Sequence, residues 1–390
     1  MDPSEILKVP IIDDHCHAFL PEKETKEFEQ YLSLSLLDLP INDVRNLFLY
    51  RRIVNELARV LKCKPSEAIK KRRELYKENP RKYIETIFQD ANITVLLVDT
   101  GYPCEEYSGY SVSLETFKEL VPCQLKPIYR IDNAITRFLY HDISFQHFLD
   151  KYIKAVKHAV KEEGAIAAKS VAAYTTGLEF SKVPDDDAEK AFESIRSRIS
   201  LGEKLTDQFL ASVKEAKTLM DYLIFKTATI CGELDVPIQI HVGIGDSPVL
   251  DLRKANPILL YDLINDEDAK KTKIIFVHTG YPYVEEAGYL ANQYPNVYLD
   301  LSEMTPFISY GIKDKLLRLL EMCPTNKILY GSDGYNIPEL FWIAALETRK
   351  SLIEVTEHFI DKKLVEEEWI SNVSKQILFE NSKRVYNLNL

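Results

Sequence analysis

Two histidines one residue apart, His15 and His17, close the first apolar run of the chain, residues 9–17. Side chains alternate between the two faces of an extended strand, so positions 15 and 17 point the same way. Neutral imidazole nitrogen is a good ligand for zinc and similar divalent ions, and two imidazoles on one face are typical of half a metal site. The alternative interpretation is a pair of surface histidines on a loop.

Three more residues with metal-binding or acid–base side chains end later apolar runs, namely His241, His278 and Asp333. We expect His15, His17 and His241 to bind one divalent ion, most readily Zn²⁺, with Asp333 as fourth ligand or as base. The sequence leaves a second ion open. A metal ion lowers the pKa of bound water to about 7, and Asp333 can accept the proton and return it to a leaving group. His278 would orient the water or polarise a substrate carbonyl.

These side chains can meet only if the fold brings the ends of their segments together. Eight short runs are apolar almost throughout, which is typical of strands buried on both faces; they are residues 9–13, 93–99, 126–132, 165–173, 236–242, 273–279, 297–302 and 327–332. Segments 145–160, 283–294 and 312–322 repeat apolar residues at helical spacing. Strands alternating with helices predict an α/β fold, a (β/α)8 TIM barrel, whose active-site residues lie at the carboxyl ends of the strands. A doubly wound open sheet is the alternative, but no GxGxxG follows any of these strands.

Two connections, residues 18–92 and 174–235, are too long for simple crossovers and are rich in helix formers. We expect helical insertions after the first and fourth strands, on the rim where lids over active sites commonly arise. The sequence has no internal repeat, low-complexity tract or Pro/Gly-rich linker. Residues 1–390 are therefore predicted to form a single domain.

Composition narrows the class of protein. The net charge of −11 disfavours a nucleic-acid-binding surface, and 46% apolar residues in a chain of 390 can bury a large core. The six cysteines lack CxxC spacing, which disfavours a disulfide framework or a structural zinc finger. No apolar segment reaches transmembrane length, and the N-terminus lacks the pattern of a signal peptide. We expect a soluble, cytoplasmic protein that acts on a small molecule, with a homo-oligomer left open.

Several runs near the predicted strand ends carry a family resemblance. They are HVGIGD (241–246), DLRKANP (251–257), YPYVEEAGYL (281–290), YPNVYLD (294–300) and GSDG (331–334). With the order HxH, His, His, Asp on strands one, five, six and eight, the chain resembles the amidohydrolase superfamily. It is most similar to the amidohydrolase-like domain that precedes a glutamine-synthetase domain in FluG and related plant nodulins. The FluG-type pattern usually has His where this chain has Tyr335, so the resemblance carries no proton-transfer role to that position.

The resemblance implies metal-dependent hydrolysis of an amide, an ester or a related bond. A small anionic amide is the leading substrate class, and the fusion to a glutamine synthetase suggests a γ-glutamyl amide. Some members of the superfamily decarboxylate or isomerise, so a metal-dependent decarboxylase is the second interpretation. A barrel that binds a ligand without catalysis is the third, and the presence of Asp333 with all four histidines disfavours it.

Charged residues in and after the strands are candidates for the rest of the site. Binuclear amidohydrolases carry a carboxylated lysine on the fourth strand that bridges two metals, and Lys169 lies in that strand; a buried ion pair or a contact to substrate are its alternatives. Arg130, on the third strand, is likewise expected either to contact the substrate or to form a buried ion pair. Arg253 suits a substrate carboxylate through its planar guanidinium, or forms a surface salt bridge. The other residues expected to line the pocket are Tyr102, Tyr174, Tyr281 and Glu303.

Overall fold

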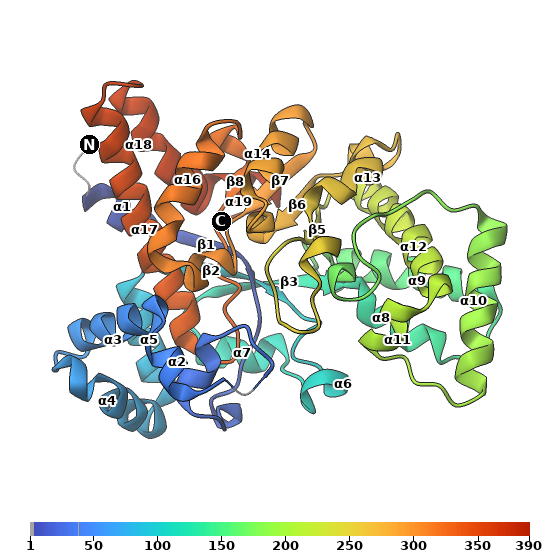
Figure 1. Ribbon diagram of the computed structural model, residues 1–390, viewed down its shortest axis with the longest axis horizontal. Helices are drawn as coiled ribbons and strands as arrows, with labels where there is room; N and C mark the ends of the chain where they lie inside the picture. The colour runs from blue at the N-terminus through green and yellow to red at the C-terminus, as the bar shows by residue number, and fades with distance from the viewer. Residues whose placement is uncertain (1–3, 38) are drawn as a thin grey trace. The chain divides into compact units, whose positions relative to one another are not determined.

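The computed structural model of the chain describes residues 4–37 and 39–390. Its eight strands follow one another in sequence order in one sheet. The first strand pairs in parallel with the second, and the third to seventh strands pair in parallel with one another in turn. This is the topology of a (β/α)8 barrel and confirms the predicted fold class (Figure 1). The strands are β1 (Ile11–Cys16), β2 (Ile93–Asp99), β3 (Gln124–Arg130), β4 (Ala168–Ser170), β5 (Ile238–His241), β6 (Ile274–Val277), β7 (Val297–Asp300) and β8 (Ile328–Leu329).

Helices fill every connection between the strands. The α-helices are α1 (Ser4–Lys8), α2 (Ile41–Arg45), α3 (Phe48–Val60), α4 (Pro65–Glu78), α5 (Pro80–Asp90), α6 (Glu105–Ser108), α7 (Leu114–Leu120), α8 (Ile131–Leu139), α9 (Phe145–Lys161), α10 (Asp185–Ser200), α11 (Asp207–Ser212), α12 (Lys214–Glu233), α13 (Tyr261–Asn265), α14 (Val284–Gln293), α15 (Met304–Phe307), α16 (Ile312–Leu320), α17 (Pro338–Asp361), α18 (Glu367–Lys375) and α19 (Asn381–Val385). Short helical turns are η1 (Pro21–Lys23), η2 (Phe28–Leu32), η3 (Ala172–Tyr174), η4 (Leu252–Lys254), η5 (Pro257–Leu260), η6 (Ala269–Lys271), η7 (His278–Gly280), η8 (Ser309–Gly311), η9 (Thr325–Lys327) and the π-turn η10 (Gln376–Glu380). Both long connections are helical, as expected. Within the described ranges, no helix is long and apolar enough to cross a membrane.

Burial explains why the apolar runs form strands. Every residue of β1 and of β4 to β8 is buried, as expected for β-branched segments with a covered surface on both faces. The fourth to eighth strands are shorter than the predicted runs, most of all the fourth, which is reduced to Ala168–Ser170 and followed by η3. The third is shifted and ends at Arg130, where α8 begins.

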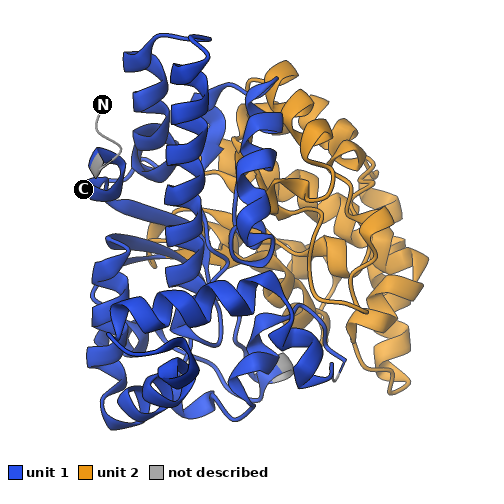
Figure 2. Cartoon of the chain, turned by 60° about the vertical axis from the view of Figure 1, so that its left-hand side comes forward, with its two compact units in different colours: residues 1–126, 300–390 blue, residues 127–299 orange. Residues whose placement is uncertain are grey.

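The chain divides into two compact units, residues 1–126 with 300–390, and residues 127–299 (Figure 2). Unit 1 therefore contains β1, β2 and β8, and unit 2 contains β4, β5 and β6. Each unit is described separately below. The expectation of a single domain stays a prediction.

Unit 1 is held by a buried arginine from the insertion after β1. Arg72 in α4 donates from Nε to Glu339 Oε1 (2.6 Å) and from both terminal nitrogens to Glu24 (2.5 and 2.8 Å). Tyr83 donates its hydroxyl to the same Glu339 oxygen (2.5 Å). Glu24 lies in the chain that leaves β1, and Glu339 lies in the first turn of α17 after β8. One guanidinium thus ties together the segments that follow two strands of the barrel.

Unit 2 contains a buried contact between two neutral side chains. Tyr152 of α9 lies 2.5 Å from Thr227 Oγ1 of α12, and both residues are buried. Thr227 donates its own proton to the carbonyl of Leu223 (2.7 Å), so the tyrosine is the donor in the first bond. The buried contact between these two long helices is therefore neutral, and an exposed ion pair of Lys157 with Glu233 (3.2 Å) joins the same helices at the surface.

Candidate active site

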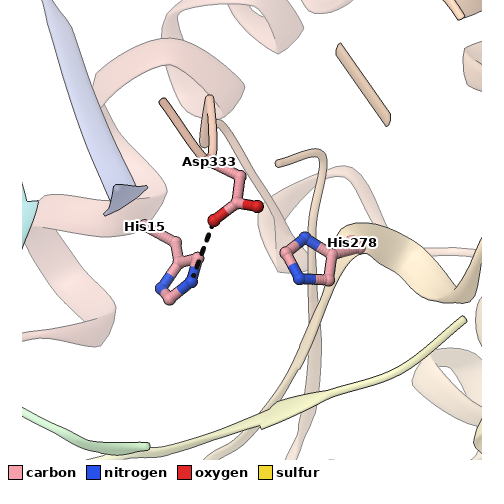
Figure 3. Close-up of side chains that lie close together, drawn as sticks. All are labelled: His15, His278 and Asp333. Carbon is pink, nitrogen blue, oxygen red and sulfur yellow. Dashed lines mark ion pairs between the residues drawn. The ribbon is translucent and has the colours of Figure 1, made fainter. Parts of the chain in front are cut away.

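In unit 1, the predicted histidine pair meets the predicted aspartate. His15 Nε2 lies 3.3 Å from Asp333 Oδ1, as Figure 3 shows by a dashed line, and His17 Nε2 lies 3.1 Å from the same oxygen. All three residues are buried. The structure therefore brings together the first two histidines and the aspartate 316 positions after His17, as their positions at the ends of β1 and β8 imply.

Backbone hydrogen bonds fix the loop that carries Asp333. The N–H of Asp333 donates to the carbonyl of His15, and the N–H of His17 donates to the carbonyl of Gly334, both at 2.8 Å. Ser332 donates from its backbone N–H and from its hydroxyl to Asp13 (2.8 and 2.5 Å). These bonds hold Asp333 at a φ of +51°, a left-handed conformation that costs a non-glycine residue of order 1 kcal/mol or more and persists where its surroundings impose it.

Buried carboxyl groups stand directly before His15 in β1. Burial raises the pKa of Asp13 to about 8; nearby Asp300 adds to the rise and the hydrogen bonds from Ser332 oppose it. The pKa of Asp14 lies well above its usual range because of burial and of the neighbouring charges of Asp300 and Asp13. A bound cation would favour the ionised forms of these groups.

A residue that the sequence reasoning missed, Asp99, belongs to the same unit. Ligand atoms of His15, His17 and Asp99 all lie within 4.8 Å of one another, and the three residues are buried. Asp99 is the last residue of β2. The signal was present in the sequence, because Asp99 ends an apolar run in the same way that the histidines end theirs.

In unit 2, His241 and His278 are close partners. His278 Nε2 lies 2.9 Å from His241 Nδ1, and His241 Nε2 lies 2.8 Å from the carbonyl oxygen of Ile244. A carbonyl only accepts, so His241 carries its proton on Nε2 and its Nδ1 accepts from His278. The ring of Tyr174 packs edge-on against His241 with centroids 4.7 Å apart, and its hydroxyl accepts the N–H of Asp246 (3.1 Å).

The position of His278 comes from a turn rather than from strand alternation. The predicted sixth strand, residues 273–279, includes His278, and alternation along it would place Phe276 and His278 on one face. In the ladder, Ile240 pairs with Phe276 and His241 pairs with Val277, so Phe276 does not share the face of His241. The strand ends at Val277, and His278 opens η7 with a φ of +75°. A left-handed residue redirects the side chain, which alternation cannot predict.

The donor atoms fit a divalent transition metal. Zinc binds imidazole nitrogen and carboxylate oxygen at about 2.0–2.2 Å in a tetrahedral arrangement, so two ligands of one ion lie roughly 3.3–3.6 Å apart. The contact of Asp333 with His15, at 3.3 Å, falls in that range, and the contact with His17, at 3.1 Å, is slightly shorter. The 2.9 Å contact between His241 and His278 is shorter still, as expected for the hydrogen bond between them. Neutral imidazoles with a carboxylate are a donor set that suits zinc and its neighbours.

Lys169 lies deeper in its strand than the histidines. It is fully buried in β4, and the ladder pairs it with Arg130 of β3 and with Gln239 of β5. Gln239 precedes His241 by two residues on the same face, so Lys169 lies about 7 Å nearer the amino ends of the strands than His241. Such a depth favours the buried-ion-pair alternative, and bridging of two metals stays a prediction.

The remaining predicted residues have diverse surroundings. Arg253 in η4 has a side chain that is 88% exposed and donates to Asp251 at 2.8 and 2.9 Å, which is the surface ion pair weighed as its alternative. Glu303 follows β7, is buried, and has a φ of +55°. Tyr281 follows η7 and is half-buried. Substrate binding by these residues stays a prediction.

Comparison with known proteins identifies the family. The protein-family model of the amidohydrolases matches residues 155–388, more than half of the chain. The chain belongs to the amidohydrolase family. Protein FluG of Emericella nidulans is 34% identical over 251 residues, which are 63% of this chain and 28% of FluG. The chain thus spans less than a third of the length of that relative.

Solved structures match over nearly the whole chain. A protein of Lactobacillus casei ATCC 334, provisionally described as a metal-dependent hydrolase, superimposes with a TM-score of 0.85 at 26% identity, covering 99% of this chain and 97% of that one. Glucuronate isomerase from Caulobacter crescentus gives a TM-score of 0.69 at 14% identity, covering 100% and 93%. Uronate isomerase from Thermotoga maritima gives 0.67 at 15%, covering 98% and 96%. The isomerases share the fold, and the reaction does not follow from it.

Proposed function

We propose that the protein is a metal-dependent hydrolase that binds one zinc ion at the carboxyl ends of its strands. The proposed ligands are His15, His17, His241 and Asp333. The observation that carries the proposal is the pair of contacts of Asp333 with His15 and His17, at 3.3 and 3.1 Å, which is close to the spacing of ligands on one ion. The family membership and the position of His241 at the end of β5 support its part in the same centre.

When bound, the ion supplies Lewis acidity that activates water and polarises a carbonyl group. The chain supplies proton transfer and orientation. Asp333 would accept a proton from the attacking water and return it to the leaving nitrogen. Its imposed backbone conformation and its loop, bonded to β1, keep the carboxylate in one place for both steps. His278 would orient the water or the carbonyl.

The proposed substrate is a small anionic amide. Positive side chains of unit 2 support this class, because Arg130 ends β3 and Arg253 lies in the turn after β5. A guanidinium recognises a carboxylate through two parallel hydrogen bonds. Arg253 would have to leave Asp251 to do so.

All six cysteines are free thiols, which supports the proposed cytoplasmic location.

Metal content and activity test the proposal together. We expect purified protein to contain close to one equivalent of zinc by elemental analysis, and chelation to lower its melting temperature, since a ligand of the native state stabilises it. The metal-loaded protein should hydrolyse members of a panel of amides, lactones and aromatic acids, with anionic amides preferred. Carbon dioxide release instead of hydrolysis would favour a decarboxylase. Protein without metal and unchanged by chelation would contradict the site.

A further inference from the structure

We infer that Asp99 is an additional ligand of the metal ion held by His15 and His17. The inference rests on the proposed function only in requiring that an ion binds at this histidine pair. It adds to the predicted ligand set a carboxylate from β2, a strand to which the sequence reasoning assigned no ligand.

The β1–β2 register brings Asp99 to the histidine pair. The parallel ladder pairs Asp13 with Leu96 and Cys16 with Val98. One residue further along both strands, His17 lies opposite Asp99 at the carboxyl edge of the sheet. The ligand atoms of Asp99, His15 and His17 accordingly lie within 4.8 Å of one another, all in unit 1.

His17 supplies an independent observation. Its Nδ1 is buried and makes no hydrogen bond within residues 4–37 and 39–390. A buried polar atom in this state costs free energy, about 1–3 kcal/mol, and its presence in a native structure commonly marks an ion or an ordered water. The ring cannot turn freely toward another partner, because Tyr102 packs edge-on against it with centroids 5.3 Å apart. Because Nε2 is the nitrogen that faces Asp333, at 3.1 Å, an ion shared with Asp333 would bind Nε2, and an ordered water at Nδ1 would remove this cost.

The carboxylate of Asp99 is already oriented. Its Oδ1 accepts the backbone N–H of Gly101 at 2.9 Å. Hydrogen bonds of this kind to a ligating carboxylate set its direction and contribute to metal affinity. The alternative role is that Asp99 only shapes the turn after β2, through this same bond.

A second carboxylate changes which ions the centre prefers. Asp99 and Asp333 together neutralise the charge of a divalent ion, whereas the histidines add none. As ligands, carboxylate oxygens favour the binding of Mn²⁺, whereas imidazole nitrogens favour the binding of Zn²⁺. Loss of Asp99 should therefore weaken Mn²⁺ binding more than Zn²⁺ binding.

The variant Asp99→Asn separates the two roles, because an amide oxygen still accepts the N–H of Gly101. Dissociation constants of the full chain for Zn²⁺ and Mn²⁺ are measured by competition with a chromophoric chelator. We expect Zn²⁺ to bind at least about tenfold more weakly and Mn²⁺ to lose more, with an unchanged melting temperature of the metal-free protein. Asp99→Glu should recover part of the affinity.

Asp266→Asn is the matched control in unit 2. Asp266 also accepts the backbone N–H of the residue two positions on, Asp268, at 3.0 Å. This variant should bind both metals as the wild type does. An equal loss in the two Asp→Asn variants, or wild-type affinity in Asp99→Asn, would overturn the inference.

The outcome also separates the inference from the proposed function. Wild-type protein that binds metal but hydrolyses nothing would remove the hydrolase proposal and leave Asp99 as a ligand, provided that Asp99→Asn binds metal more weakly. Wild-type protein that binds neither ion would overturn both. The absorption spectrum of bound Co²⁺ gives a reading independent of activity, and it should differ between wild type and Asp99→Asn.

Discussion

The two histidine groups are held in different ways. In unit 1, His15 and His17 face the carboxylate of Asp333, and reciprocal backbone hydrogen bonds join the segments that carry them. In unit 2, His241 and His278 contact each other and a backbone carbonyl. Within unit 1 the first group offers negative charge, whereas within unit 2 the second offers the hydrogen-bonded pair of imidazoles.

The same contrast extends to the scaffold of each unit. Unit 1 is joined by the buried ionic network of Arg72, whereas unit 2 is joined by the neutral contact between Tyr152 and Thr227. Breaking a buried ion pair leaves an uncompensated charge, whereas loss of a neutral hydrogen bond costs much less. Unit 1 should therefore dominate both the chemistry and the sensitivity of the protein to substitution.

Asp333→Asn tests the chemical side of this contrast most strongly. We expect hydrolysis to slow by about 10²- to 10⁴-fold, because an amide cannot accept the proton that Asp333 takes. Zinc should remain largely bound through the histidines. The checks are the rate constant kcat on a hydrolysed substrate and the zinc content of the variant. An unchanged rate would show that another group is the base.

Arg72→Met tests the scaffold of unit 1. It removes the partner of two buried or largely buried carboxylates, Glu339 and Glu24, and should destabilise the protein by roughly 3–5 kcal/mol in urea unfolding. The neighbouring Arg73 pairs with Glu27 on the surface, so Arg73→Met is a matched control. Its unfolding midpoint should stay close to that of the wild type. Equal midpoints for the two variants would contradict the importance of the buried network.

His278→Asn tests the histidine pair of unit 2, His241 and His278. The substitution removes the nitrogen that lies 2.9 Å from His241, so the ring of His241 loses its neighbour. We expect zinc affinity to fall about 10- to 100-fold, the usual effect of losing a group that orients a ligand. Competition with a chelator measures it, and exposed His158 in α9 gives the control His158→Asn. A variant with undiminished affinity would mean that unit 2 contributes little to metal binding.

The sequence predicted those parts of the site that depend on local pattern. Apolar runs identified the strands, because burial selects β-branched residues. The fold collects strand ends, so His15, His17 and Asp333 lie close together, and their role in binding a metal stays a prediction. Asp99 also ends an apolar run, but its proximity to His17 depends on the β1–β2 register, which no local pattern encodes.

The turn at His278 was missed for a similar reason. Its left-handed backbone is imposed by the surrounding structure, because few residues other than glycine adopt that conformation and no local pattern marks it here. The end of β3 at Arg130 follows from tertiary contacts as well. Asp132, expected on the strand, lies instead in the first turn of α8 and accepts the N–H of Val171 at 3.1 Å and the hydroxyl of Ser170 at 3.4 Å.

Tyr152→Phe has the smallest expected effect and measures the neutral scaffold of unit 2. Removal of the hydroxyl deletes one buried hydrogen bond, while Thr227 keeps its bond to Leu223. We expect a loss of about 1 kcal/mol in urea unfolding, and zinc affinity equal to that of the wild type. Tyr289→Phe, at an exposed position of α14, is the control and should leave the midpoint unchanged. A loss as large as that of Arg72→Met would erase the contrast between the two units, because a neutral bond would then matter as much as a buried charge network.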